Sequence, residues 1–375
     1  MIINGLGLQK EEEAVFLLRS LYEKYGFSQY KMNKFEAYDL YVQNKDFLIS
    51  DGIITFTDTN GKLMALKPDV TLSIVKNSSE EENVVEKVYY DENVYRVSSG
   101  TNSFKEIRQV GIECIGAVDS YQIFEVLYLA AKSLQTLSED SVLDISDFGM
   151  LTELAEAVGL DSAIRRKVFK LIGEKNLHEL VSTCKKVGLE EEKISALSAF
   201  VTVYGDPCVA LPELKEALGK FISEERFVRL ETLFSGLAKA GIGGMVNLDF
   251  SVVSDTDYYN GIVFRGFIKK IPLRVLSGGQ YDRLLEKMGK KSKAIGFAVY
   301  LDLLSDLSVN EKRFDVDALL LYDESVSEEM ISSCAQEMVS EGKKVVVQKN
   351  VPEKLRFLEL YRITESGVKL LERNA

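Results

Sequence analysis

The sequence contains very few of the residues that metal and thiol chemistry require. It has one histidine, His178, and four cysteines, Cys114, Cys184, Cys208 and Cys334. No two cysteines form a CxxC pair, so the spacing predicts four free thiols in a reducing cytosol. A single histidine argues against a metal centre and, without a nucleophile motif, against a Ser–His or Cys–His catalytic site. We expect no metal and no cofactor, and we interpret His178 as a surface residue of a helix.

The sequence also lacks long hydrophobic runs and an excess of positive charge. A hydrophobic fraction of 46% and a mean hydropathy of -0.03 are typical of a globular protein. No segment reaches the length of a membrane helix, and residues 10–13 are charged without a signal-peptide pattern. These features predict a cytoplasmic protein with no membrane partner.

The charge balance bears on the expected partners. The chain has 58 acidic and 46 basic residues, a formal net charge of -12. Binding a polyanion requires a basic patch, and no Lys/Arg-rich block with interleaved aromatic residues is present. Transfer RNA is therefore not an expected partner.

The length and the residue patterns predict several domains. A chain of 375 residues is too long for a single core. An amphipathic helix is predicted at 10–25 and a β-hairpin at 53–66, around Asn60-Gly61. Asp69, after Pro68, is predicted to cap the next helix.

The rest of the chain changes character twice. A long helix is predicted at 120–137, and residues 151–240 have the pattern of helices throughout. Strand patterns return after residue 245, and the tail has the pattern of a small α/β unit. We predict an α+β fold with a core formed by 1–150 and 241–310, an inserted all-α module at 151–240, and a short C-terminal α/β domain at 311–375.

The segment 107–116 has the alternation of a β-strand. Its apolar face carries Val110, Ile112 and Cys114, whereas its other face carries Gln109, Gly111 and Glu113. One interpretation is an ordinary half-exposed strand, which this segment alone favours. The other is a binding surface, in which the glycine leaves room for a small ligand, Glu113 binds an ammonium group and Gln109 binds a polar group.

Five segments together resemble a known family. They are TFTDTNGKLMALKPDVT at 55–71, QVGIE at 109–113, DYYNGIVF at 257–264, GGQYD at 278–282 and AIGFAVYLDLL at 294–304. Their order is similar to that of the motifs in class II aminoacyl-tRNA synthetases, and specifically in histidyl-tRNA synthetase, over roughly residues 15–120 and 245–305. The resemblance implies an antiparallel sheet flanked by helices, with GGQYD in a glycine loop.

The resemblance also implies a histidine-binding site. Residues at seven positions match the family's histidine contacts: Asp69, Thr71, Gln109, Glu113, Tyr258, Tyr259 and Tyr281. Carboxylates suit an ammonium group, aromatic walls suit a flat ring, and neutral hydroxyls suit ring nitrogens. The alternative for Tyr258 and Tyr259 is ordinary sheet packing, because aromatic residues are common in strands.

Departures from the family pattern concern the nucleotide. Ser254 stands where synthetases carry a charge-stabilising arginine. Asp302 and Leu303 stand where the family's third motif ends in a second arginine. Arg96 is retained in the second motif as a possible phosphate or anion contact. Losing two charge-assisted contacts removes roughly 3–6 kcal/mol, or about two to four orders of magnitude in rate.

A histidine pocket without nucleotide chemistry resembles the regulatory subunit of short-form ATP phosphoribosyltransferase. This resemblance implies a non-catalytic protein that supports the separate catalytic subunit in the first step of histidine biosynthesis and mediates feedback inhibition by histidine. It also implies a homodimer within a hetero-octamer. Two alternatives stay open, a divergent histidine–tRNA ligase and a free-standing histidine sensor.

Overall fold

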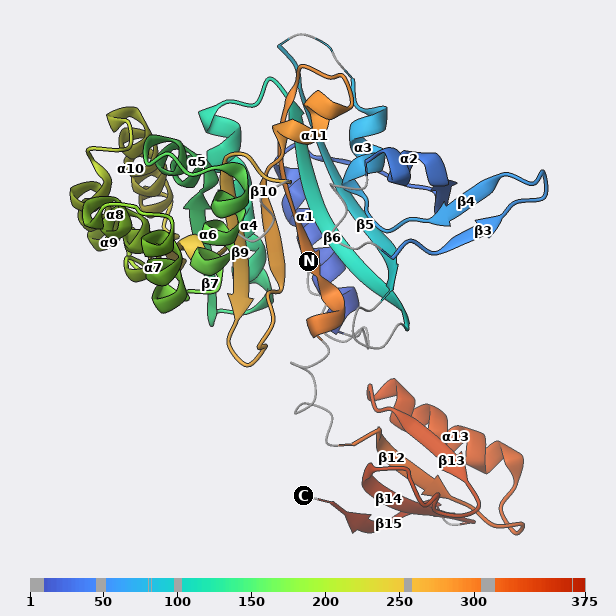
Figure 1. Cartoon of the computed structure of the whole chain (residues 1–375). Helices are drawn as coiled ribbons and strands as arrows, with labels where there is room; N and C mark the ends of the chain where they lie inside the picture. Colours follow the sequence, from blue (N-terminus) through green and yellow to red (C-terminus); the bar gives the residue numbers. More distant parts are fainter. Residues whose placement is uncertain are drawn as a thin grey trace. The chain divides into compact units, whose positions relative to one another are not determined.

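The computed structural model describes residues 10–44, 52–79, 81, 83–97, 103–252, 258–304, 314–365 and 367–374 (Figure 1). The chain forms two compact units, residues 1–305 and 306–375. Within the described residues, no helix combines the length and the apolar character needed to cross a membrane.

The first unit is built on an eight-stranded sheet with the order β1-β5-β6-β11-β10-β9-β7-β8. The strands are β1 (Ser28–Gln29), β5 (Val85–Val97), β6 (Phe104–Gly116), β7 (Ser141–Asp147), β8 (Val246–Leu248), β9 (Ile262–Ile268), β10 (Leu276–Gln280) and β11 (Lys293–Tyr300). Only the outermost pairs, β1 with β5 and β7 with β8, are parallel. The sheet is therefore mixed with an antiparallel centre, which confirms the predicted fold class.

Two predicted long helices cover one face of this sheet. They are α1 (Lys10–Lys24) and α4 (Ser120–Leu137), and the hydroxyls of Tyr22 and Ser133 join them at 2.9 Å. Tyr22 also packs against Tyr89 of β5. Because side chains alternate along a strand, Tyr90 points to the opposite face. There it shares a buried cluster with residues of α3 (Thr71–Asn77) and α11 (Asp282–Lys287).

A three-stranded arm extends from the sheet (Figure 1). Its strands are β2 (Phe35–Ala37), β4 (Leu63–Leu66) and β3 (Thr55–Thr57), in the order β2-β4-β3, and α2 (Tyr38–Gln43) follows β2. The predicted hairpin is confirmed, because β3 and β4 pair antiparallel and Gly61 has a φ of 79° in the turn between them.

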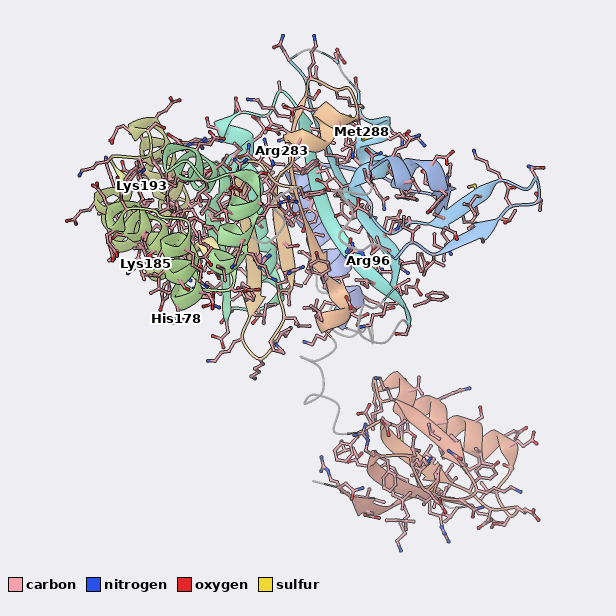
Figure 2. The ribbon with its side chains drawn as sticks, in the orientation of Figure 1. Arg96, His178, Lys185, Lys193, Arg283 and Met288 are labelled. Atoms are coloured by element: carbon pink, nitrogen blue, oxygen red, sulfur yellow. The ribbon has the colours of Figure 1, made fainter. Side chains whose placement is uncertain are left out.

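The predicted helical segment is confirmed, although it begins slightly earlier, at Phe148. It consists of α5 (Phe148–Ala157), α6 (Ser162–Gly173), α7 (Leu177–Lys186), α8 (Glu191–Thr202), α9 (Pro207–Leu218) and α10 (Glu224–Lys239). Short 3-10 turns at Gly243–Met245 and Phe250–Val252 flank β8. His178 is exposed on α7, as expected (Figure 2). The boundaries that separate this segment as a module stay a prediction.

The second unit is a small α/β structure. Its four strands, β12 (Val316–Leu321), β13 (Val345–Gln348), β14 (Phe357–Thr364) and β15 (Gly367–Arg373), have the order β13-β12-β14-β15. Among the residues of this unit that the structure describes, the helix α13 (Glu328–Ser340) packs against the sheet through Cys334 and Met338. The predicted strand–helix–strand pattern is confirmed, and two further strands follow it.

Candidate functional site

The centre of the candidate site is the carboxylate of Glu113 on β6, a residue that is only 2% exposed. The Thr71 hydroxyl donates a hydrogen bond to Glu113 Oε1 at 2.8 Å, and the Tyr281 hydroxyl donates one to Oε2 at 2.6 Å. Thr71 begins α3 and Tyr281 precedes α11, so residues far apart in the sequence converge on one carboxylate.

Burial sets the protonation of this carboxyl group. It raises the pKa of Glu113 to about 8, although the two hydroxyl donors oppose the shift. A carboxyl group in this state carries its proton near neutral pH. A bound ammonium group would favour the ionised form, so the pocket is suited to a cationic ligand.

Asp69 adds a second buried carboxyl group, 7% exposed, beside the start of α3. Burial raises the pKa of Asp69, although the hydrogen bond from the Leu72 N–H and the positive charge of Arg96 offset part of the rise. The prediction that Asp69 is the helix cap needs correction, because α3 begins at Thr71 and Val70 occupies the cap position. Asp69 Oδ1 nevertheless accepts the Leu72 N–H at 2.9 Å, which satisfies one free donor of the first turn.

Three tyrosines form an aromatic wall. The ring centroid of Tyr258 lies 4.7 Å from that of Tyr259 and 5.7 Å from that of Tyr281. Burial raises the pKa of both Tyr258 and Tyr281, so their hydroxyls stay neutral donors. All three rings pack in the cluster that lies between β5, α3 and α11.

Gln109 lies on the same face of β6 as Glu113 but closer to the outer end of the strand. It is 3% exposed and pairs with Glu92 of β5 and Tyr300 of β11. The structure thus gathers five of the other six predicted residues around Glu113, and Gln109 extends the same row toward a neighbouring cavity.

Two predictions about the surroundings of Glu113 were wrong. The strand is not half-exposed, because residues 110–115 are buried on both faces. The space over Gly111 is not empty either, because a Cβ built there would lie 2.5 Å from the Tyr90 hydroxyl. The glycine that makes room for Glu113 is Gly296 on β11, where a Cβ would lie 1.7 Å from Glu113 Oε2.

The neighbouring cavity has a volume of about 410 Å³ and contains three arginines. Arg96 reaches it from β5, Arg265 from β9 and Arg274 from the turn before β10. Arg96 Nε donates to the Pro68 carbonyl oxygen at 2.9 Å, and Figure 2 shows Arg96 on the outer part of β5. Asp302 also lines the cavity. Burial raises the pKa of its carboxyl group, and the positive charge of Lys105 offsets only part of the rise.

The sequence reasoning missed Arg265 and Arg274, since neither belongs to a recognised motif and only the pairing of β9 with β10 brings them together. Ser254, the position of the missing arginine, lies outside the described residues. The segment 278–280 is not the expected loop, because it forms the end of β10.

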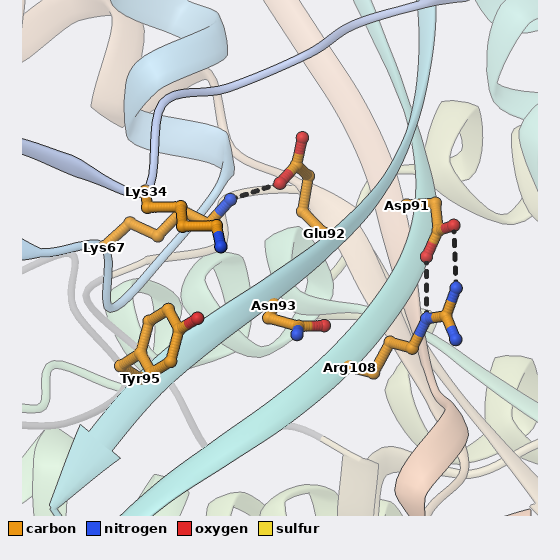
Figure 3. Close-up of a pocket in the computed structure, with 7 residues that line it drawn as sticks. All are labelled: Lys34, Lys67, Asp91, Glu92, Asn93, Tyr95 and Arg108. Carbon is orange, nitrogen blue, oxygen red and sulfur yellow. Dashed lines mark hydrogen bonds and ion pairs between the residues drawn. The ribbon is translucent and has the colours of Figure 1, made fainter.

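A smaller cavity of about 240 Å³ lies where the arm joins the sheet (Figure 3). Its charges are paired with one another. Lys67, 1% exposed, forms an ion pair with Glu92, and Arg108 donates to the two oxygens of Asp91 at 3.0 and 3.1 Å. These pairs stabilise the junction and leave few free charges for a ligand.

No group of acidic, histidine and cysteine side chains suited to a metal occurs in the described part of the chain.

This chain is similar to one protein family and to several named proteins. The family model described as histidyl-tRNA synthetase matches residues 7–304. A relative from Oceanobacillus iheyensis named ATP phosphoribosyltransferase regulatory subunit is 23% identical over 345 residues, covering 90% of this chain and 84% of that protein.

Two solved structures are similar to this chain. One, from Bacillus halodurans, is described as an ATP phosphoribosyltransferase regulatory subunit/histidyl-tRNA synthetase, with a TM-score of 0.71, 23% identity, and coverage of 90% of this chain and 88% of that one. The other belongs to the ATP phosphoribosyl transferase (HisG:HisZ) complex of Thermotoga maritima, with a TM-score of 0.61, 21% identity, and coverage of 78% and 97%. At this level of identity the structural likeness supports the fold.

Proposed function

We propose that this chain, which belongs to the histidyl-tRNA synthetase family through residues 7–304, is a non-catalytic regulatory subunit of ATP phosphoribosyltransferase in histidine biosynthesis. Relatives named for this role match most of the chain, and a similar chain occurs in the ATP phosphoribosyl transferase complex of Thermotoga maritima. We place the protein in the cytoplasm, in keeping with its four unpaired cysteines.

The observation that carries the ligand assignment is the buried Glu113 carboxylate held by two hydroxyls. Histidine offers an ammonium group and a flat polar ring, and the site offers carboxylates and aromatic walls. We assign the ligand contacts to the seven residues Asp69, Thr71, Gln109, Glu113, Tyr258, Tyr259 and Tyr281. The polar side chains are already oriented by one another, which lowers the cost of binding.

Histidine regulates the complex only if it binds one arrangement better than another. The active and inhibited arrangements of the complex then shift by the difference between the two binding free energies. The proposed partner is the short-form catalytic subunit, with which this chain would form a hetero-octamer.

Titration calorimetry with histidine tests the ligand. We expect binding to the wild-type protein and a loss of affinity of about tenfold to a hundredfold in Glu113→Ala, since a buried charge-assisted contact is removed. Glu106→Ala is the matched control, because Glu106 lies on the same strand but is exposed. Equal affinity in both variants would refute the contact.

Mixing the chain with a short-form catalytic subunit tests the partner. We expect co-elution, an increase in transferase activity, and loss of that increase on adding histidine. Histidine binding without co-elution would instead favour the free-standing sensor.

We also propose that the chain is a homodimer whose interface includes the arm. The outer face of β2-β4-β3 carries the apolar residues Phe35, Ala37, Ile54, Phe56, Met64 and Leu66, of which Phe35 is 49% and Phe56 38% exposed. Residues 31–67 contain five lysines and five acidic residues, a net charge of zero in a chain of -12. Two acidic copies therefore meet there with little repulsion.

Light scattering tests this interface. We expect the double substitution Phe35→Ser/Phe56→Ser to shift the protein from dimer to monomer. Val209→Ser, which removes a residue 68% exposed on α9, should leave the dimer unchanged. A dimer that survives the double substitution at low concentration would exclude the arm.

One observation favours a histidine–tRNA ligase as a second candidate. The cavity beside the pocket retains Arg96, together with Arg265 and Arg274. Asp302 in the same cavity opposes a phosphate-binding role, because it places an acidic group where the family carries an arginine. Histidine-dependent pyrophosphate exchange separates the two candidates, because only a ligase would catalyse it at a useful rate.

A further inference from the structure

The Tyr90 hydroxyl occupies the space over Gly111, in the row formed by Gln109, Gly111 and Glu113. Tyr90 on β5 pairs directly with Gly111 on β6, and the residue is 2% exposed. A Cβ at Gly111 would lie 2.5 Å from the hydroxyl oxygen. The absence of a side chain at this position is therefore what allows the hydroxyl to lie between the two polar residues of the strand.

This hydroxyl differs from those of the other buried tyrosines. The Tyr22 hydroxyl bonds to Ser133 at 2.9 Å, and the Tyr281 hydroxyl donates to Glu113 at 2.6 Å. The Tyr90 hydroxyl makes no hydrogen bond with any described residue, although buried tyrosines usually find a partner.

The surroundings of the Tyr90 hydroxyl also distinguish it from a sealed core group. Tyr41, in the same cluster, has a hydroxyl that is closed off from solvent and has no hydrogen-bond partner among the described residues. The Tyr90 hydroxyl lies instead beside polar side chains, because it is placed over Gly111, between Gln109 and Glu113 on the same face of β6.

We propose that Tyr90 is a further ligand contact, whose hydroxyl forms a hydrogen bond with the amino acid bound at Glu113. The inference rests on the proposed function, because it assumes that the pocket binds histidine. Burial, with the charges of Glu113 and Asp69, raises the pKa of Tyr90 well above its usual value. The hydroxyl therefore stays protonated, and it can donate to a ligand acceptor or accept from a ligand N–H.

The substitution Tyr90→Phe removes only the hydroxyl and keeps the ring in the cluster. We expect the affinity for histidine, measured by calorimetry, to fall about three- to tenfold, as for the loss of one hydrogen bond. Tyr41→Phe is the matched control, because it removes an equally unpartnered but sealed hydroxyl, and we expect it to leave the affinity within about twofold. The melting temperatures of both variants without ligand check that the fold is intact.

The outcomes distinguish this inference from the proposed function. Wild-type binding with unchanged affinity in Tyr90→Phe overturns the Tyr90 contact alone. An equal loss in Tyr90→Phe and Tyr41→Phe also overturns it, because the effect then comes from packing. Absence of histidine binding to the wild-type protein, both alone and with the catalytic subunit, overturns the ligand assignment itself.

Discussion

The proposed histidine site around Glu113 and the arginine cavity belong to one fold, but their polar groups are arranged differently. In the pocket, both oxygens of Glu113 accept hydrogen bonds, and Gly296 leaves the space that this carboxylate occupies. The cavity is lined by Asp302 as well as by the three arginines. The Arg274 side chain makes no hydrogen bond or ion pair within the described residues. A site ordered by its own contacts is prepared for a ligand, and in the cavity Arg96 is held in the same way by the Pro68 carbonyl oxygen, whereas Arg274 is not.

The largest expected effect is on adenylation. If the cavity has lost the nucleotide chemistry, histidine-dependent ATP–pyrophosphate exchange should be about two to four orders of magnitude slower than in an active synthetase, because two charge-assisted contacts are missing. The measurement is radiolabelled pyrophosphate exchange with purified protein. Exchange at the rate of an active synthetase would remove the contrast between the two sites and favour the ligase.

The next effect concerns the space for Glu113. Gly296→Ala places a Cβ where it would lie 1.7 Å from Glu113 Oε2 and 2.5 Å from the Ile112 carbonyl oxygen. We expect a loss of histidine affinity of about a hundredfold and a loss of stability of about 1–3 kcal/mol. Gly244→Ala is the control, because its Cβ would meet no atom within 4 Å. Calorimetry and urea unfolding measure both quantities, and similar results for the two variants would contradict the close packing at Gly296.

The pH dependence of stability tests the burial of Glu113. Its pKa is raised to about 8 in the folded protein, from a usual value of 4.5, so the folded state holds its proton more tightly than the unfolded state. The free energy of unfolding therefore falls as pH rises from about 4.5 to about 8, by up to a few kcal/mol.

Glu113→Gln removes this dependence. Urea unfolding of both proteins at several pH values should give a difference in stability that favours the variant increasingly up to about pH 8. Parallel curves for the two proteins would show that Glu113 is not the buried acid that the geometry indicates.

The smallest expected effect is that of a cavity residue on the affinity for histidine. Arg274→Ala should change the histidine affinity by less than about twofold, because the side chain has no contact with the pocket residues that the structure describes. A loss comparable to that of Glu113→Ala would show that the two sites act as one.

Much of the fold could be predicted from local patterns. The helices α1 and α4 and the hairpin of β3 and β4 follow from apolar spacing, Gly26 and Asn60-Gly61. The two final strands of the second unit were missed, because mixed segments such as 367–373 are exposed along most of their length and carry little alternation.

The candidate site was predicted less completely, since the resemblance supplied seven histidine contacts and Arg96 but not Tyr90, Arg265 or Arg274. Tyr90 had no signal in the sequence beyond strand packing, and its meaning depends on pairing with Gly111. Arg265 and Arg274 likewise gain a shared cavity only when β9 pairs with β10. Contacts of this kind join residues that are distant in the sequence, so no local pattern contains them.

The sequence alone determined the composition of the site and the elements that carry it, because side-chain chemistry and helix or strand periodicity are local properties. The tertiary structure decided which side chain fills the space left by each glycine. Gly111 admits the Tyr90 hydroxyl and Gly296 admits the Glu113 carboxylate, because strand register sets the residues that face one another across the sheet.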